Sequence, residues 1–197
     1  MQESVTEEGC PCFGIAFVDT ATAAFQLTEF EDDLEFTKFE TFVAQIRPRE
    51  LILEKNNISM KATRILKTNT ALTTIWNKLA PGKEFWEART TIREIISAEY
   101  FSRDEPEDMD KWPKVLVDSQ DKELVLSALG GLLSYLQHLK VDKDLVSIGN
   151  FAWYDPIRKA TSLVLDGQTL QNLEVGPHVY SELTAWSNGI LDICKFL

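Results

Sequence analysis

The run Phe13-Gly14-Ile15-Ala16-Phe17-Val18 is short, apolar and rich in residues that favour extended backbone, so it predicts a buried β-strand. Asp19-Thr20-Ala21-Thr22 follows it and is typical of a turn. Ala23, Phe25 and Leu27 then recur at every second position, which is the period of a strand with one buried face. We therefore expect these two runs to form a β-hairpin.

A helix is expected soon after this hairpin. Asp32 and Glu35 have the spacing of a capping box, in which a side chain accepts the free amides of a first helical turn. Apolar residues then fall on one helical face, and they are Phe36, Phe39, Phe42, Val43 and Ile46. Pro48 ends the helix, because the residue before a proline disfavours helical backbone.

Strand and helix patterns continue to alternate along the chain. Leu51-Ile52-Leu53 and residues 72–76 predict strands, and Ser59 can cap a helix between them. Residues 88–99 have helical spacing of apolar side chains. Leu124–Leu139 is apolar on nearly all sides, which predicts a buried helix.

These patterns define the expected organisation of the chain. Strands that alternate with helices, opened by a hairpin, predict an α/β domain with a mixed sheet flanked by helices over residues 13–158. Residues 1–12 are acidic and irregular, and we expect a linker there. Residues 102–113 are acidic and contain Pro106 and Pro113, which predicts a loop.

Composition and charge exclude several classes of function. The 197-residue chain is 44% hydrophobic and 26% charged, which is typical of a soluble globular domain. Its net charge of −11 repels a phosphate backbone, so we do not expect this segment to hold DNA. No run reaches the roughly 20 apolar residues of a membrane helix. The first residues also lack the pattern of a secretory signal.

No nucleotide-binding motif is present. A P-loop needs a glycine, four further residues and then Gly-Lys followed by Ser or Thr. The only Gly-Lys pair is Gly82-Lys83, which is followed by Glu84 and has Asn77 at the position of the first glycine. We therefore expect that the isolated chain does not bind ATP.

One arrangement of carboxylates suggests an alternative function as a nuclease. In ribonuclease-H-like nucleases, a carboxylate on the first strand joins others to hold two metal ions about 4 Å apart. Asp19 lies at the end of the first strong strand, and Glu40 and Glu54 are conceivable partners. The alternative interpretation is a turn aspartate and two surface glutamates, which a strongly acidic chain supplies by chance.

The cysteines and histidines do not form a convincing metal site. Cys10 and Cys12 are separated by Pro11 alone, whereas a structural zinc site usually has two pairs of ligands spaced two to four residues apart. The other candidate ligands are scattered, and they are His138, His178 and Cys194. We expect thiols in a reducing compartment, structural or solvated histidines, and no bound metal.

Two further features have competing interpretations. Phe36, Phe39 and Phe42 resemble a ligand-binding box, but their helical spacing favours a role in the core. The acidic run Asp104–Asp110 is typical of a solvated loop and is also a candidate partner-binding segment. An acidic protein-interaction domain is therefore a third possible function of the chain.

Several blocks of sequence occur in a fixed order along the chain. They are Phe13–Thr22, Glu29–Asp33, Glu54–Ser59, Pro81–Trp86, Ser97–Phe101, Ser127–Gly131, Tyr135-Leu136 and Ser162–Glu174. In this order the blocks resemble the connector domain of the MutS family of DNA mismatch-repair proteins, and they are most similar to fungal members. The resemblance implies a ribonuclease-H-like mixed sheet flanked by helices, followed by the start of the helical lever region.

The resemblance also implies a function without catalysis. In the MutS family the connector joins a mismatch-reading domain to the levers and transmits conformational change between DNA and the ATPase domain. We therefore expect this chain to be part of a larger nuclear protein, with no catalytic, cofactor-binding or metal-binding residues of its own. The parent family binds ATP and magnesium in another domain, and its partners are a second MutS homologue, a MutL-type protein and mismatched DNA.

The resemblance sets boundaries as well. Residues 159–175 resemble the start of the lever domain, whereas residues 176–197 have no counterpart in the family and are expected to pack poorly. Phe85-Trp86-Glu87 matches the Phe-x-Glu pattern of the mismatch wedge, but it lies within the connector pattern. The role of the wedge is therefore not transferred to it.

Overall fold

The structure is a computed structural model that describes residues 1–7, 9–101 and 112–154. The expected start of the lever domain at 159–175 and the tail at 176–197 lie outside the described residues. The same is true of the acidic run Asp104–Asp110, of His178 and of Cys194.

The described chain alternates between strands and helices. The strands are β1 (Gln2–Val5), β2 (Pro11–Asp19), β3 (Ala24–Glu31), β4 (Glu50–Glu54), β5 (Ile75–Leu79) and β6 (Phe151–Trp153). The helices are α1 (Thr37–Ile46), α2 (Met60–Asn69), α3 (Ala88–Ala98), α4 (Lys114–Asp118), α5 (Glu123–Leu139) and α6 (Asp142–Val146). None of the described helices is long and apolar enough to cross a membrane.

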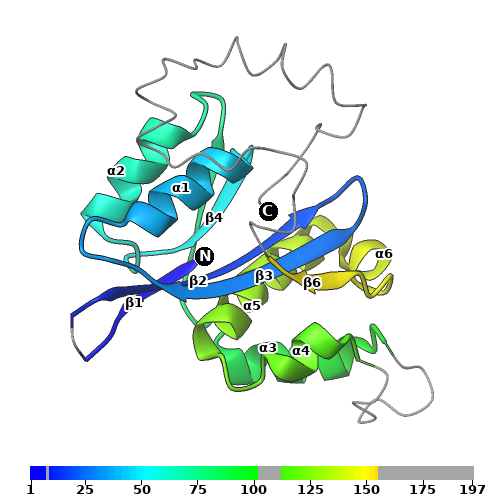
Figure 1. Cartoon of the computed structure of the whole chain (residues 1–197). Coiled ribbons are helices and arrows are strands. Elements are labelled where there is room, and N and C mark those ends of the chain that lie inside the picture. The colour runs from blue at the N-terminus through cyan, green and yellow to red at the C-terminus, as the bar shows by residue number, and fades with distance from the viewer. Residues whose placement is uncertain (8, 102–111, 155–197) are drawn as a thin grey trace.

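The strands form a mixed arrangement (Figure 1). β2 pairs with β1 on one side and with β3 on the other, both antiparallel, and β6 adds to β3 in parallel. β4 and β5 form a separate parallel pair. The Met1 amine donates a hydrogen bond of 3.0 Å to the Ile52 carbonyl, so β4 lies beside the start of β1. The predicted hairpin and the predicted mixed α/β class are both confirmed.

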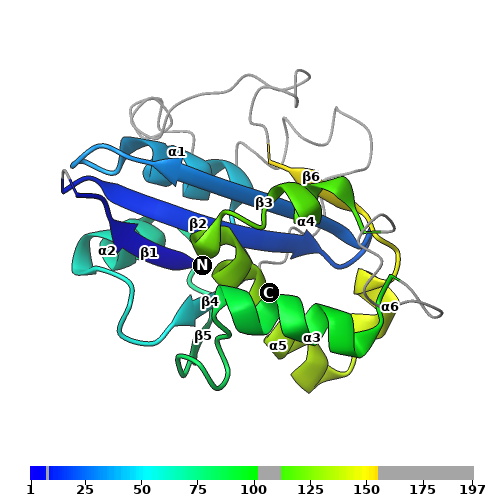
Figure 2. The ribbon, with the colours of Figure 1, turned by 90° about the horizontal axis from the view of Figure 1, so that it is seen from below.

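Strand β2 contributes to two hydrophobic cores because its side chains alternate between the two faces of the sheet. Phe13, Ile15 and Phe17 belong to a core formed with α1, α2 and β4. Ala16 and Val18 belong to the other core, which α3, α4 and α5 complete. Figure 2 shows these last three helices in front of the strands and α1 and α2 behind them. The sheet is therefore covered on both faces.

Aromatic rings fill the core beneath α1. The ring of Phe13 stacks on that of Phe39 with centroids 4.4 Å apart, and Phe17 meets Phe42 edge to face at 5.8 Å. Phe36 is also buried. The side chains of Phe39 and Phe42 on α1, and of Phe36 just before it, thus belong to the core, as the sequence predicted.

The capping of α1 differs from the predicted capping box. The Asp32 carboxylate is buried and accepts the amides of Lys38 and Phe39 at 3.0 and 2.7 Å. Glu35 instead extends outward and pairs with Lys61 at 2.9 Å. The predicted role of Asp32 is therefore confirmed, but the pairing with Glu35 was wrong, because Phe36 has a left-handed backbone conformation and the helix begins only at Thr37.

The prediction of a linker over residues 1–12 was also wrong. Residues 2–5 form β1, and Glu3 is buried within it. Its carboxylate accepts the Ser59 amide at 2.7 Å, and its backbone exchanges two hydrogen bonds with the Asn57 side chain. These contacts offset the desolvation of a charged group, and residues more than 50 positions away provide them.

The fourth strand begins later than predicted. We expected residues 72–76, but β5 starts at Ile75, because residues 71–74 form a turn in which the Thr74 amide bonds the Ala71 carbonyl at 3.0 Å. Thr74 also donates its hydroxyl to the Pro48 carbonyl at 3.1 Å. Leu72, whose apolar character suggested a strand, is fully exposed. The cap of α2 was predicted correctly, since the Ser59 hydroxyl accepts the Ala62 amide at 3.1 Å.

Helix α5 approaches β2 closely at Gly14. A Cβ atom on Gly14 would lie 2.5 Å from the Leu124 carbonyl oxygen, which is closer than Cβ atoms approach in real structures. Glu29, the partner of Gly14 on β3, accepts the Val125 amide at 3.3 Å in the first turn of α5. The missing side chain at Gly14 thus lets the start of α5 rest directly on the sheet.

We predict that Gly14→Ala destabilises the domain by about 2 kcal/mol, because the added methyl collides with helix backbone, which cannot rotate away as a side chain can. The measurement is the free energy of unfolding in urea. Ser97→Ala on the exposed side of α3 is the control and should change it by less than about 0.5 kcal/mol. Equal stabilities of Gly14→Ala and the control would show that α5 does not approach β2 this closely.

Candidate functional site

The three carboxylates of the nuclease alternative have different hydrogen-bond partners. Asp19 accepts the Ala21 amide at 2.9 Å and the Thr22 hydroxyl at 2.8 Å, so it caps its own turn. Glu54 accepts from the Gln2 side chain at 3.1 Å, and Glu40 on α1 accepts from Asn69 at 3.4 Å. Among the described residues, no three His, Cys, Asp or Glu side chains are placed to hold a metal ion. The structure therefore does not bring these three together as a metal site.

The described thiols do not belong to any group of three or more potential metal ligands among the described residues. Cys10 precedes β2 and Cys12 lies within it, and both are partly buried. Burial raises the pKa of the Cys12 thiol, and the carboxylates of Glu29 and Glu31 on β3 act in the same direction. A raised pKa disfavours the thiolate, which is the form that binds zinc and reacts with electrophiles.

The Phe85-Trp86-Glu87 segment has a structural role. Phe85 and Trp86 are buried in the core under α5, where the Phe85 ring lies against Gly131. The Trp86 carbonyl accepts the Ser127 hydroxyl of α5 at 2.9 Å. A residue that inserts into DNA must be exposed, so the buried Phe85 is not suited to the role of a mismatch wedge.

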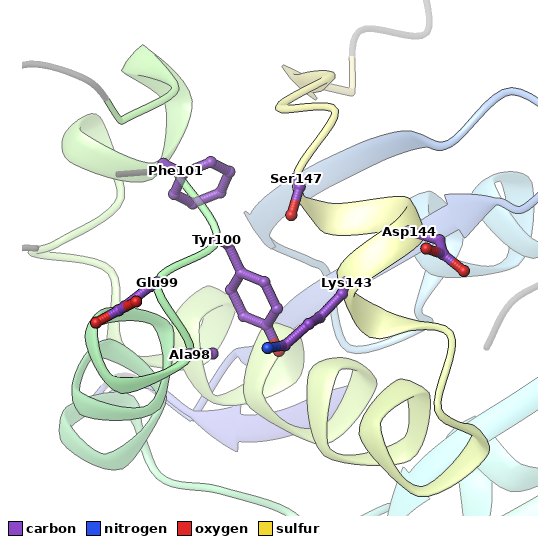
Figure 3. Close-up of a pocket in the computed structure, with 7 residues that line it drawn as sticks. All are labelled: Ala98, Glu99, Tyr100, Phe101, Lys143, Asp144 and Ser147. Carbon is purple, nitrogen blue, oxygen red and sulfur yellow. The ribbon is translucent and has the colours of Figure 1, made fainter. Parts of the chain in front are cut away.

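A hollow of about 470 Å³ lies between the end of α3 and α6 (Figure 3). Tyr100 and Lys143 point toward the middle of the hollow, whereas Glu99 and Asp144 point away from it. The residues that line it are Ala98, Glu99, Tyr100, Phe101, Lys143, Asp144 and Ser147. Its lining is mostly polar, with the Lys143 amine, the Ser147 hydroxyl and the Tyr100 hydroxyl among the described groups.

Tyr100, which lines this hollow, forms hydrogen bonds with residues of two helices. Its hydroxyl donates to the Asp142 carboxylate at 2.8 Å and accepts from Gln137 at 3.1 Å. Burial raises the pKa of Tyr100 above its usual value, and Asp142 adds to this effect while Gln137 opposes it. The hydroxyl therefore stays protonated, and it joins α3 to α5 and α6 as a structural link.

A second polar link joins α5 to the β4–β5 pair. The Tyr135 hydroxyl donates to Glu50 Oε1 at 2.7 Å, and Asn77 donates to the same oxygen at 2.6 Å. Burial raises the pKa of Tyr135 to about 12, with the hydrogen bond to Glu50 acting in the same direction. Neither tyrosine link is recognisable in the sequence, because the bonded residues are separated by 37 to 85 positions and match no local motif.

Comparison with known families identifies the class of this domain. Residues 4–149 match the family described as MutS domain II, which covers the described fold from β1 to the end of α6. The chain therefore belongs to the MutS family and contains its domain II, the connector. The matched region begins within β1, which supports the finding that residues 2–5 are part of the domain and not a linker.

Individual relatives place the chain within this family. It is similar to the DNA mismatch repair protein MSH6 of Saccharomyces cerevisiae, with 48% identity over 165 residues. It is 32% identical to Msh6 of Gallus gallus and 32% identical to Msh6 of Homo sapiens. These alignments cover 83–89% of this chain but only 13–15% of each relative. The chain thus corresponds to a small part of the length of these proteins.

The Tyr135 link leads to a pH-dependent prediction. The pKa of Tyr135 is raised from 10.0 to about 12 in the folded chain, so between these values the unfolded chain loses a proton that the folded chain keeps. The free energy of unfolding should therefore fall as pH rises from 10 toward 12. We predict a shallower fall in Tyr135→Phe, which lacks this proton, measured by urea unfolding across that range. Identical slopes would contradict the partly buried hydrogen bond to Glu50.

Proposed function

We propose that this chain acts as the connector of a MutS-type mismatch-repair protein and carries movement between a mismatch-reading domain and an ATPase domain. The observation that carries the proposal is the match of residues 4–149 to MutS domain II. The relatives that share this region are named as DNA mismatch repair proteins, which supports the same biological process.

The packing of the domain suits such a role. An element that transmits a displacement must not absorb it, and densely packed cores resist deformation. The two cores share the strands of one sheet, and β2 has buried side chains on both of its faces. Tyr135 adds a polar link from α5 to β4, so a push on one helical layer reaches the other.

Under this proposal the chain has no reaction of its own. ATP and magnesium bind to the ATPase domain of the parent protein, and mismatched DNA binds to its mismatch-reading domain. The partners of the parent are a second MutS homologue, which forms a heterodimer with it, and a MutL-type protein. Such a protein works in the nucleus, where its DNA substrate is located.

The two other functions have less support. The nuclease alternative requires Asp19 to share a metal site, and the hydrogen bonds of Asp19 are satisfied within its own turn. An acidic protein-interaction domain agrees with the net charge of −11, but the acidic run that motivated it lies outside the described residues. The connector function explains the family match and the two-sided core together.

A domain exchange tests the connector function. Residues 4–149 would replace the matching segment of the Saccharomyces cerevisiae relative, at 48% identity. We expect the exchanged protein to bind mismatched DNA and to keep mismatch-stimulated ATP turnover, whereas a protein lacking the segment loses the stimulation. Turnover is measured with matched and mismatched duplexes. An exchanged protein that binds the mismatch but shows no stimulation would contradict the proposal.

A further inference from the structure

Positive charge is concentrated in one part of this acidic chain. Residues 55–83 contain no Asp or Glu and six basic residues, which are Lys55, Lys61, Arg64, Lys67, Lys78 and Lys83. The rest of the chain holds all 31 acidic residues and the other 14 of the 20 basic residues. The net charge of −11 therefore conceals a locally basic region, which comprises α2, β5 and the turns beside them.

Helix α2 presents part of this charge to solvent. Its inner face, formed by Ala62, Ile65 and Leu66, packs into the core beside α1. Arg64 and Lys67 are exposed on the outer side, and neither forms a salt bridge with any described residue. Figure 1 shows α2 at the margin of the molecule, with no other described element over its outer side.

Two exposed apolar side chains lie at the N-terminal end of the same helix. Met60 is 91% exposed, and Leu34, in the turn before α1, is 68% exposed. Lys61 holds that turn against α2, because its Nζ donates to the Leu34 carbonyl at 2.6 Å and lies 5.4 Å from the centre of the Phe36 ring. We call the surface formed by Leu34, Met60, Arg64 and Lys67 the α2 face.

We propose that the α2 face binds an acidic segment of a partner protein that also carries a bulky apolar side chain. Arg64 and Lys67 would attract the carboxylates, and Leu34 and Met60 would bury the apolar group. This binding goes beyond the connector function, since it needs neither DNA nor movement between domains. It also differs from the acidic-domain hypothesis, because here the chain supplies the basic side of the contact.

The properties of the α2 face favour a short peptide over nucleic acid. A DNA backbone has no group that benefits from contact with two exposed aliphatic side chains, and a long duplex extends past the patch to the acidic remainder, which repels it. The ten-residue helix is about 15 Å long, so an extended segment of about five residues spans it. At physiological salt, charges more than roughly 8 Å apart are largely screened, so the surrounding acidic surface repels so short a ligand only weakly.

The test uses the 197-residue chain and a fluorescein-labelled peptide of alternating Asp and Glu with one central Leu. Fluorescence anisotropy should show saturable binding that weakens as salt rises. The double variant Arg64→Glu, Lys67→Glu should bind the peptide about tenfold more weakly. The double variant Arg64→Gln, Lys67→Gln, which keeps the helix intact, should bind it about fivefold more weakly. Arg89→Glu with Arg93→Glu on α3 is the matched control and should change the affinity less than about twofold.

The contribution of the two apolar side chains of the α2 face is tested separately. Met60→Ser with Leu34→Ser should weaken binding of the Leu peptide, but should leave unchanged the binding of a peptide with Ser in place of that Leu. Absence of saturable binding, or equal losses in the α2 and α3 variants, would overturn the proposal. So would a random-sequence DNA duplex that displaces the peptide at lower concentration, since the α2 face would then be a phosphate site.

Discussion

The two-sided burial of β2 is the constraint on which the rest of the structure depends. Its odd-numbered residues from Phe13 to Phe17 lie in the core under α1 and α2, whereas Ala16 and Val18 lie in the core under α5. Gly14 leaves room for the start of α5, and Glu29 on the neighbouring strand accepts one of the helix's first amides. Both helical layers are therefore positioned by one strand, and neither can shift without disturbing β2.

This arrangement bears on the proposed function. Under that proposal the domain must behave as one body, because a domain with two independent halves would dissipate the movement. Two tyrosine hydroxyls link the elements of the domain, since Tyr100, just after α3, is bonded to α5 and α6, and Tyr135 joins α5 to β4. The hydrogen bonds of these hydroxyls connect separate elements, so we assign them a structural role.

Local patterns predicted most of the fold from the sequence. The hairpin, the phenylalanine-rich helix and the apolar α5 were recognisable because their periodicity is contained within a few turns of chain. β1 was missed, because Glu3 is acceptable in a strand only through Ser59 and Asn57, which are distant in sequence. Asp32 caps α1 as predicted, but Glu35 does not complete the capping box, because the backbone conformation of Phe36, which no sequence pattern indicated, moved the helix start.

Features of the candidate sites were harder to predict than the fold. The links through Tyr100 and Tyr135 join residues from separate elements, so no motif marks them. The basic residues of 55–83 are present in the sequence, but the net charge of the whole chain does not reveal them. Whether they are exposed on α2 depends on which face of the helix packs into the core. The order of family-like blocks was the one strong functional signal, and the match to MutS domain II agrees with it.

Native-state hydrogen exchange tests most directly whether the domain is one rigid body. If β2 unites both layers, the slowest amides of α1, β2 and α5 should exchange with the same free energy, equal to that of global unfolding in urea. The contradictory result is a helical layer whose amides all exchange at a clearly lower free energy while β2 stays protected. The two cores would then open independently, and the domain could not carry movement from one face to the other.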